Sequence, residues 1–143
     1  MGAAAEGWGA MIFPLDSSAM IAFLRQEQGW EVVRDLLADR AHTCLAHAIN
    51  LCEVFYDFYR QGGRPAAEAV IRDLSRGITI REDMDTAFWQ EAGRIKAQYR
   101  RVSLADCFCI TLARRVGGEV VTADHHEFDA LVPLGLCPVR FIR

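Results

Sequence analysis

Four acidic residues occupy positions where their carboxylates could meet: Asp16, Glu53, Asp106 and Asp124. Asp16 and Asp124 each end an apolar run that is typical of a buried strand. In an open parallel sheet, binding sites form beyond the carboxyl ends of the strands. Carboxylates crowded at such an edge repel one another, and Mg²⁺ or Mn²⁺ would relieve the repulsion. The pattern therefore indicates a metal site with oxygen ligands, provided that the fold brings the four acids together.

Each acid also has a purely structural interpretation. Asp16 could cap the helix that follows it, and Asp124 could cap a short turn. Ser103-Leu104-Ala105-Asp106 matches a capping box, with Ser103 as the N-cap and Asp106 as the third helical residue. Glu53 lies off the apolar stripe of its helix, so a solvated face would explain it. Taken singly, each acid fits either interpretation.

The elements that must position these acids alternate between strands and helices. We expect strands at 11–15, 42–46, 77–80, 119–124 and 139–142, and helices at about 19–25, 29–38, 48–60, 66–74, 84–99 and 104–116. Gly62-Gly63 followed by Pro65 separates the third helix from the fourth. Strands alternating with helices predict an α/β fold, a three-layer α/β/α sandwich with a mainly parallel central sheet.

The length of 143 residues, of which 52% are apolar, suits a single domain with one sizeable core. Residues 1–10 are rich in Gly and Ala and show no periodicity, so we expect a flexible leader there and the domain at 11–143. The start of the chain does not resemble a secretory signal, and no run is long enough to cross a membrane. We therefore expect a cytoplasmic protein.

Other potential ligands are less convincing than the acids. The five cysteines form no CxxC pair, and they fit small core residues in a reducing compartment better than zinc ligands. His125-His126 is better explained as a surface pair than as a metal site.

A formal net charge of −3 indicates no general affinity for polyanions. Any contact with nucleic acid would therefore depend on a local basic patch. The candidates are Arg94, Lys96, Arg100, Arg101, Arg114 and Arg115. Because helical spacing does not place them all on one face, at most a subset could line a groove, and the rest would be ordinary solvated positions.

Several segments, taken in order, resemble the PIN domain, and within that family the VapC-type toxins of prokaryotic toxin–antitoxin pairs. They are LDSSAMIAFL (15–24), Asn50-x-x-Glu53, SLADCFCITLARR (103–115) and VVTAD (120–124) followed by Glu127-Phe128. The resemblance covers nearly the whole chain from Met11. Position by position, the four acids of the family fall on Asp16, Glu53, Asp106 and Asp124, and Thr122 matches its usual Ser or Thr.

The resemblance implies a metal-dependent endoribonuclease that uses Mg²⁺ or Mn²⁺ to hydrolyse RNA phosphodiester bonds. One ion, or two about 4 Å apart, can activate water and stabilise the leaving oxygen. On this basis Asp16, Asp106 and Asp124 would bind metal, and Glu53 would orient or deprotonate the attacking water. Asp129 is a further possible ligand.

The resemblance also implies a small antitoxin protein as a partner, and we expect a homodimer. The dimer rests on apolar residues of the early helices that exceed what one helix pair should bury: Ala22, Phe23, Leu24, Val32, Val33, Leu36 and Leu37. The alternative is that these side chains all face the protein's own sheet.

Three other functions compete with the ribonuclease. A structure-specific DNA nuclease would use similar acids, although such enzymes carry extra elements that clamp DNA. A non-catalytic PIN-like RNA-binding or scaffold module is disfavoured because all four acids are present. A receiver or phosphatase domain is disfavoured because DSSA (16–19) lacks the second Asp of the aspartyl-phosphatases.

Overall fold

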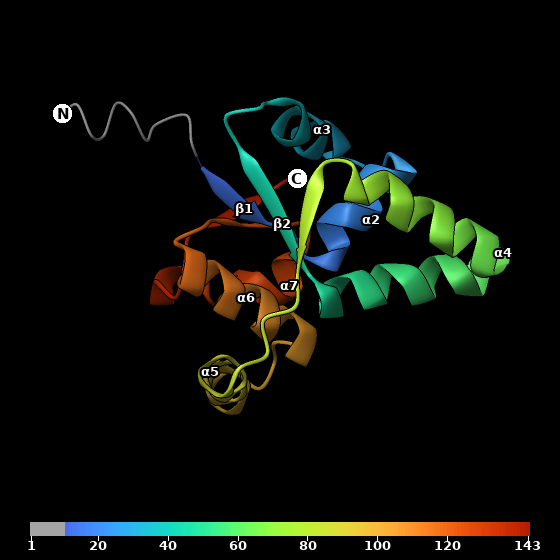
Figure 1. Ribbon diagram of the computed structural model, residues 1–143. Coiled ribbons are helices and arrows are strands. Elements are labelled where there is room, and N and C mark those ends of the chain that lie inside the picture. The colour runs from blue at the N-terminus through green and yellow to red at the C-terminus, as the bar shows by residue number, and fades with distance from the viewer. Residues whose placement is uncertain (1–10) are drawn as a thin grey trace.

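The computed structural model describes residues 11–143, and the expected leader, residues 1–10, lies outside the described residues. Strands β1 (Ile12–Pro14), β2 (Thr43–His47) and β3 (Ile78–Arg81) form a parallel sheet in the order β1-β2-β3. β4 (Val120–Thr122) pairs in parallel with β5 (Val139–Phe141). A parallel bridge between Leu15 and Val121 joins the two parts. The strands therefore follow one another in the order β3-β2-β1-β4-β5 (Figure 1).

Helices cover both faces of this sheet. The first group is α2 (Ser17–Arg25), α3 (Trp30–Ala38) and α4 (Ala48–Ser75), and the second is α5 (Thr86–Gln98), α6 (Leu104–Val116) and α7 (His125–Phe128). A 3-10 turn, η1 (Val132–Leu134), precedes β5. Side chains of β2 point alternately to the two faces of the sheet. Cys44 and Ala46 pack against the first group of helices, and Leu45 packs against the second group. The three-layer α/β/α prediction is confirmed.

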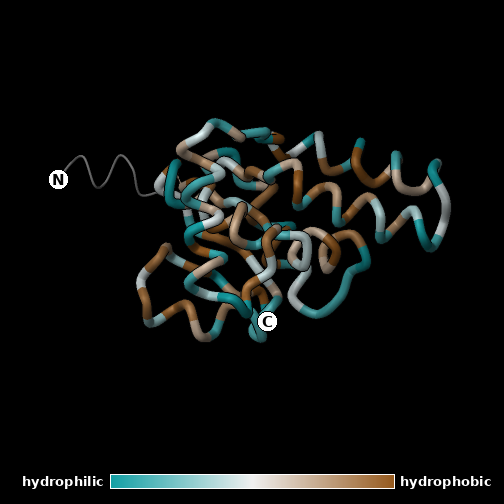
Figure 2. Tube along the Cα trace, turned by 90° about the horizontal axis from the view of Figure 1, so that it is seen from below, coloured by the Kyte–Doolittle hydropathy of each residue, from teal (hydrophilic) through white to brown (hydrophobic). Residues whose placement is uncertain are grey.

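Helix α4 consists of two arms that meet at Gly63. The backbone there has φ 80° and ψ −178°, a left-handed conformation that favours glycine, and Pro65 starts the second arm. The two arms lie side by side and project from the body of the domain (Figures 1 and 2). Hydrophilic and hydrophobic residues alternate along both arms in Figure 2, so each arm is amphipathic. The first arm carries Glu53, and the second returns the chain to β3.

The apolar residues of α2 and α3 are used within the domain. Ala22, Val33 and Leu36 are buried, and Phe23, Leu24, Val32 and Leu37 pack against the same core. The domain itself therefore covers most of this apolar surface, and Phe23, Leu24, Val32 and Leu37 stay partly exposed. All five cysteines are free thiols. Within residues 11–143, no helix is both long enough and apolar enough to cross a membrane.

Candidate metal centre

Asp16 lies between β1 and α2 and is only 1% exposed. Its Oδ1 accepts hydrogen bonds from Ala19 N at 2.9 Å and Ser18 Oγ at 2.7 Å, so it caps α2 as its structural interpretation expects. Its Oδ2 accepts a hydrogen bond from Thr122 Oγ1 at 2.5 Å, which ties the carboxyl ends of β1 and β4 together. Burial raises the pKa of Asp16 to about 6, although the hydrogen bonds from Thr122, Ala19 and Ser18 oppose the rise.

Asp106 lies in the first turn of α6 and is 4% exposed. Ser103 caps this helix, because its Oγ accepts a hydrogen bond from Asp106 N at 3.1 Å. A complete capping box would also place the Asp106 carboxylate on Ser103 N–H. Ser103 N instead donates to Glu127 Oε1 at 2.5 Å. The carboxylate of Asp106 therefore does not close the capping box.

Burial is the largest cause of the raised pKa of Asp106, which reaches about 9. The negative charges of Asp16, Glu127 and Glu53 raise it further, as does a hydrogen bond with the side chain of Glu127. A carboxyl group in this environment holds its proton at neutral pH. The environment thus disfavours an additional negative charge and would favour a cation.

Asp106 and Asp124 come together with a third acid that sequence analysis did not single out, Glu127. One carboxylate oxygen from each of the three lies within 4.8 Å of the others. Asp124 caps α7, with its Oδ1 accepting a hydrogen bond from Glu127 N at 3.0 Å. The signal in the sequence was the spacing Asp124-x-x-Glu127, which places the two side chains one helical turn apart.

Glu53 is half-buried on the first arm of α4, and it is not one of the three grouped acids. It is close enough for its charge to raise the pKa of Asp106. Asn50, one turn earlier, is fully buried and donates from Nδ2 to Ala105 O at 3.3 Å. This contact holds the arm against α6 next to Asp106. The structure thus places Asp16 and Glu53 beside the group that contains Asp106 and Asp124.

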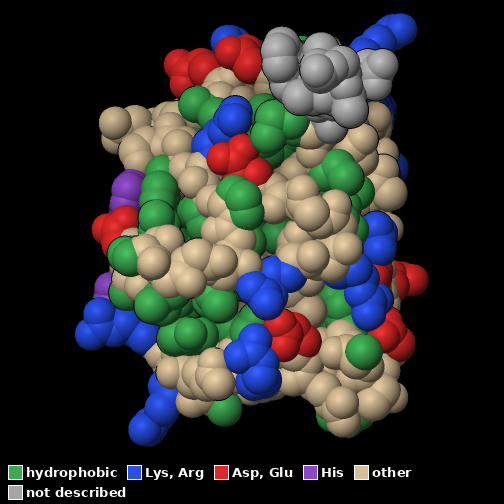
Figure 3. All heavy atoms as spheres, turned by 90° about the vertical axis from the view of Figure 1, so that its left-hand side faces the viewer, with side chains coloured by type: hydrophobic (Ala, Val, Ile, Leu, Met, Phe, Trp, Pro, Cys, Tyr) green, Lys and Arg blue, Asp and Glu red, His purple; other side chains and the backbone are tan. Residues whose placement is uncertain are grey.

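Most of the candidate basic residues are already engaged. Arg94 and Arg114 both pair with Glu91, and Arg115 pairs with acidic side chains at the start of α5. Lys96 donates to two backbone carbonyls. Within residues 11–143, the side chains of Arg100 and Arg101 form no hydrogen bond or ion pair. On the face drawn in Figure 3, acidic and basic side chains are intermixed rather than separated by sign.

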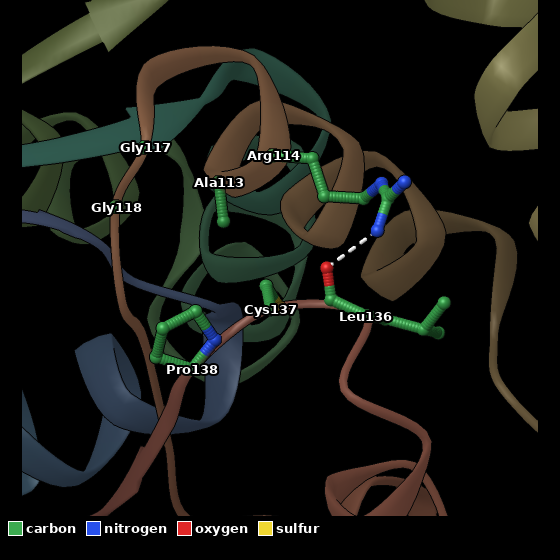
Figure 4. A pocket seen from close by; sticks show the side chains of 7 residues that line it. All are labelled: Ala113, Arg114, Gly117, Gly118, Leu136, Cys137 and Pro138. Atoms are coloured by element: carbon green, nitrogen blue, oxygen red, sulfur yellow. Dashed lines mark hydrogen bonds between the residues drawn. The ribbon is translucent and has the colours of Figure 1, made fainter.

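The remaining ligand candidates do not belong to the group of three acids. The side chain of Asp129 pairs with His125 Nδ1 at 2.7 Å, and the His125 ring stacks on Phe141. A pocket of about 490 Å³ lies at the carboxyl end of α6 and has no acidic side chain in its lining. Arg114 donates across it to Leu136 O at 2.6 Å (Figure 4). Neither region contains a cluster of acidic side chains like the one formed by Asp106, Asp124 and Glu127.

Comparisons with known proteins agree with this architecture. A family model described as the PIN domain matches residues 14–132. The structure of VapBC2 from Rickettsia felis, bound to a promoter DNA fragment, has a TM-score of 0.72 and 15% identity, covering 92% of this chain and 98% of that chain. DNA-bound VapBC from Salmonella typhimurium has a TM-score of 0.71 and 19% identity, covering 93% and 99%.

A third similar structure is VapC20 from Mycobacterium tuberculosis, described as a sarcin–ricin loop cleaving toxin. Its TM-score is 0.67 at 18% identity, covering 84% of this chain and 95% of that chain. Among curated proteins, no relative matches this chain. At these low identities, the structural likeness establishes the fold.

Proposed function

We propose that this chain, which belongs to the PIN-domain family, is a metal-dependent endoribonuclease and the toxin of a type II toxin–antitoxin pair. The observation that carries the proposal is the group of carboxylates from Asp106, Asp124 and Glu127, with buried Asp16 beside it. Carboxylate oxygens are the ligands that Mg²⁺ and Mn²⁺ prefer.

The spacing of these oxygens fits a divalent ion. They lie within 4.8 Å of one another, whereas ligands on opposite sides of Mg²⁺, each about 2.1 Å from it, lie roughly 4.2 Å apart. Small side-chain movements would therefore bring them into coordination. We assign Asp16, Asp106 and Asp124 as ligands, and we add Glu127 as a fourth.

A bound ion would supply an activated water and would offset charge on the scissile phosphate. The residues of the chain prepare the site for it. Thr122 and Ser18 hold the carboxylate of Asp16 in one orientation through their hydroxyl groups. Asp106 must release its proton to become a ligand, so metal binding should weaken as the pH falls. We assign Glu53 to orient the attacking water and to accept its proton on a carboxylate oxygen.

RNA is the substrate that we favour because the similar VapC20 structure is described as that of a sarcin–ricin loop cleaving toxin, and the sarcin–ricin loop is a segment of RNA. The antitoxin partner is supported by similar structures that contain VapBC or toxin–antitoxin complexes. We propose that the partner inserts an arginine among the carboxylates. A guanidinium group can bridge two carboxylates through paired hydrogen bonds, so it would compete with the metal.

We also propose a homodimer and a cytoplasmic location. The dimer is supported by exposed large apolar side chains near β3 and the start of α5, namely Ile80, Met84 and Trp89. Five free thiols are consistent with a reducing compartment.

The test is cleavage of single-stranded RNA by the purified chain with Mg²⁺ or Mn²⁺. Asp106→Asn should lower the rate by about 100-fold or more, because it removes a ligand charge. Asp129→Asn is the matched control, since Asp129 is an exposed acid paired with His125, and its rate should match the unsubstituted protein. Full activity in excess EDTA, or cleavage of DNA flaps but not RNA, would contradict the proposal.

A further inference from the structure

A small pocket adjoins the carboxylate group on the side of Glu127. It has a volume of about 160 Å³ and lies between the α5–α6 turn and the segment that contains α7 and η1. Its lining comprises Tyr99, Arg100, Arg101, Val102, Glu127, Ala130, Leu131 and Leu134. Pockets for drug-sized ligands have volumes of about 300 Å³ or more. This pocket therefore suits a single planar group.

The pocket and the acids share Glu127. This residue lines the pocket, and its carboxylate is also one of the three that lie within 4.8 Å of one another. Ser103 N–H fixes that carboxylate by donating to Oε1 at 2.5 Å. A group held in the pocket would therefore be the immediate neighbour of a phosphate held at the acids.

Arg100 and Arg101 give the pocket an unneutralised positive rim. Within residues 11–143, only four arginines form no ion pair, and the other two are Arg40 and Arg72. Arg100 and Arg101 are the pair that is adjacent in sequence, and both are exposed. In a chain with net charge −3 whose other arginines mostly have acidic partners, two free guanidinium groups at one rim indicate an anionic ligand.

The turn that presents these arginines is held by the protein itself. Lys96 Nζ donates to Arg100 O at 2.9 Å and to Val102 O at 2.7 Å. Val102 N donates to Tyr99 O at 3.0 Å. The backbone of this turn is thus organised before any ligand arrives, which lowers the entropic cost of binding.

We propose that this pocket binds one unpaired nucleobase of the RNA, next to the phosphate that is cut, while Arg100 and Arg101 contact flanking phosphates. The inference rests on the proposed ribonuclease function. Apolar walls and the aromatic side chain of Tyr99 suit a base, because single-stranded bases bind proteins largely by stacking and apolar contact. A basic segment of a protein partner is disfavoured here, since two free guanidinium groups would repel it.

The experiment measures binding, so that it does not depend on cleavage. Glu53→Gln protein with Mn²⁺ is titrated with labelled short RNAs that each lack one base at a successive position. Loss of the base next to the cleavage site should weaken binding on the order of 10-fold. Adding Ala130→Phe, which fills the pocket from an exposed position, should weaken binding of intact RNA similarly and should remove the effect of the missing base.

The matched control is Ala97→Phe, the same change at an exposed position of α5 outside the pocket, and it should leave binding unchanged. Arg100→Gln with Arg101→Gln provides a second measurement. It should lower the salt dependence of binding by about 0.7 per lost phosphate contact, and the position of the sensitive base should not move.

Equal binding of all the RNAs by Glu53→Gln protein would overturn the base pocket and leave the ribonuclease proposal standing. Binding of none of them would overturn both. If Ala130→Phe weakened binding of the antitoxin but not of RNA, the pocket would belong to the protein partner and our proposal would be wrong.

Discussion

Asp106→Asn is expected to stabilise the metal-free protein while it removes a metal ligand. The folded-state pKa of Asp106 is raised from 3.8 to about 9, chiefly by burial and then by the charge of Asp16. The folded protein therefore holds a proton that the unfolded chain releases. The stability that comes from protonated Asp106 is fully present below pH 3.8 and is lost as the pH rises toward 9. A protein with asparagine at this position does not lose this stability as the pH rises, because asparagine does not ionise.

The size of the effect follows from the same shift. Between the two pKa values, the free energy of unfolding should fall by about 1.4 kcal/mol per pH unit. From pH 3.8 to pH 7 the loss reaches about 4 kcal/mol if Asp106 alone responds. Asp16, with a pKa raised to about 6, adds a similar slope only below that pH. At pH 7 we expect Asp106→Asn to be about 2–4 kcal/mol more stable, which corresponds to a melting temperature roughly 10 °C higher.

The assay is urea unfolding in EDTA at several pH values between about 6.5 and 8, a window that lies inside the shift of Asp106. The unsubstituted protein should lose stability steeply as the pH rises, and Asp106→Asn should keep only the smaller slope that comes from the raised pKa of His125. Asp35→Asn is the control, because Asp35 is exposed and paired only with Arg34, and it should change stability by less than about 0.5 kcal/mol. If Asp106→Asn were less stable than the unsubstituted protein, or kept its steep pH slope, the carboxylate would be stabilising α6 rather than being strained by its neighbours.

Three further predictions concern the leader, Glu127 and assembly. A chain that starts at Met11 should melt within a few degrees of the full-length protein and cleave RNA equally well; aggregation of this chain would move the domain boundary. Glu127→Gln can still accept the Ser103 N–H bond, so it should fold normally and lower cleavage by about 10-fold or more, whereas unchanged cleavage would remove it from the ligand set. Light scattering at micromolar concentration should give twice the 16.0 kDa chain mass, and a monomer would refute the dimer.

The sequence was sufficient to predict the order of the elements, because each is marked by local features. Short apolar runs mark the strands, and Gly62-Gly63 with Pro65 marks the point where the two arms of α4 meet. The ends of elements were less accurate. The strand expected to reach Asp124 ends at Thr122, because Ala123 and Asp124 leave the sheet to start α7. Such ends depend on tertiary hydrogen bonds, such as Ala123 N to Ser18 Oγ.

The residues of the candidate site were predicted from two sources, the resemblance to the PIN domain and the positions of acids at the ends of strands. Sequence analysis did not identify Glu127 as a ligand. Its carboxylate is positioned by the N–H of Ser103, which is distant in sequence and is brought close by the fold. The sequence also could not show which basic residues lack an ion-pair partner. Arg94 and Arg114, for example, lie on different helices and both pair with Glu91. Nor could it show that the domain itself buries Val33 and Leu36, because helix periodicity identifies an apolar face without showing what covers it.

The central claim is that the grouped carboxylates bind a divalent ion, and titration with Mn²⁺ followed by electron paramagnetic resonance tests it most directly. The full-length protein should remove Mn²⁺ from solution, and Mg²⁺ should compete for the same site. Asp106→Asn should bind Mn²⁺ at least about 10-fold more weakly, whereas Asp129→Asn should bind it as tightly as the unsubstituted protein. Equal affinity of the Asp106→Asn and unsubstituted proteins, or no bound Mn²⁺ in either, would contradict the account.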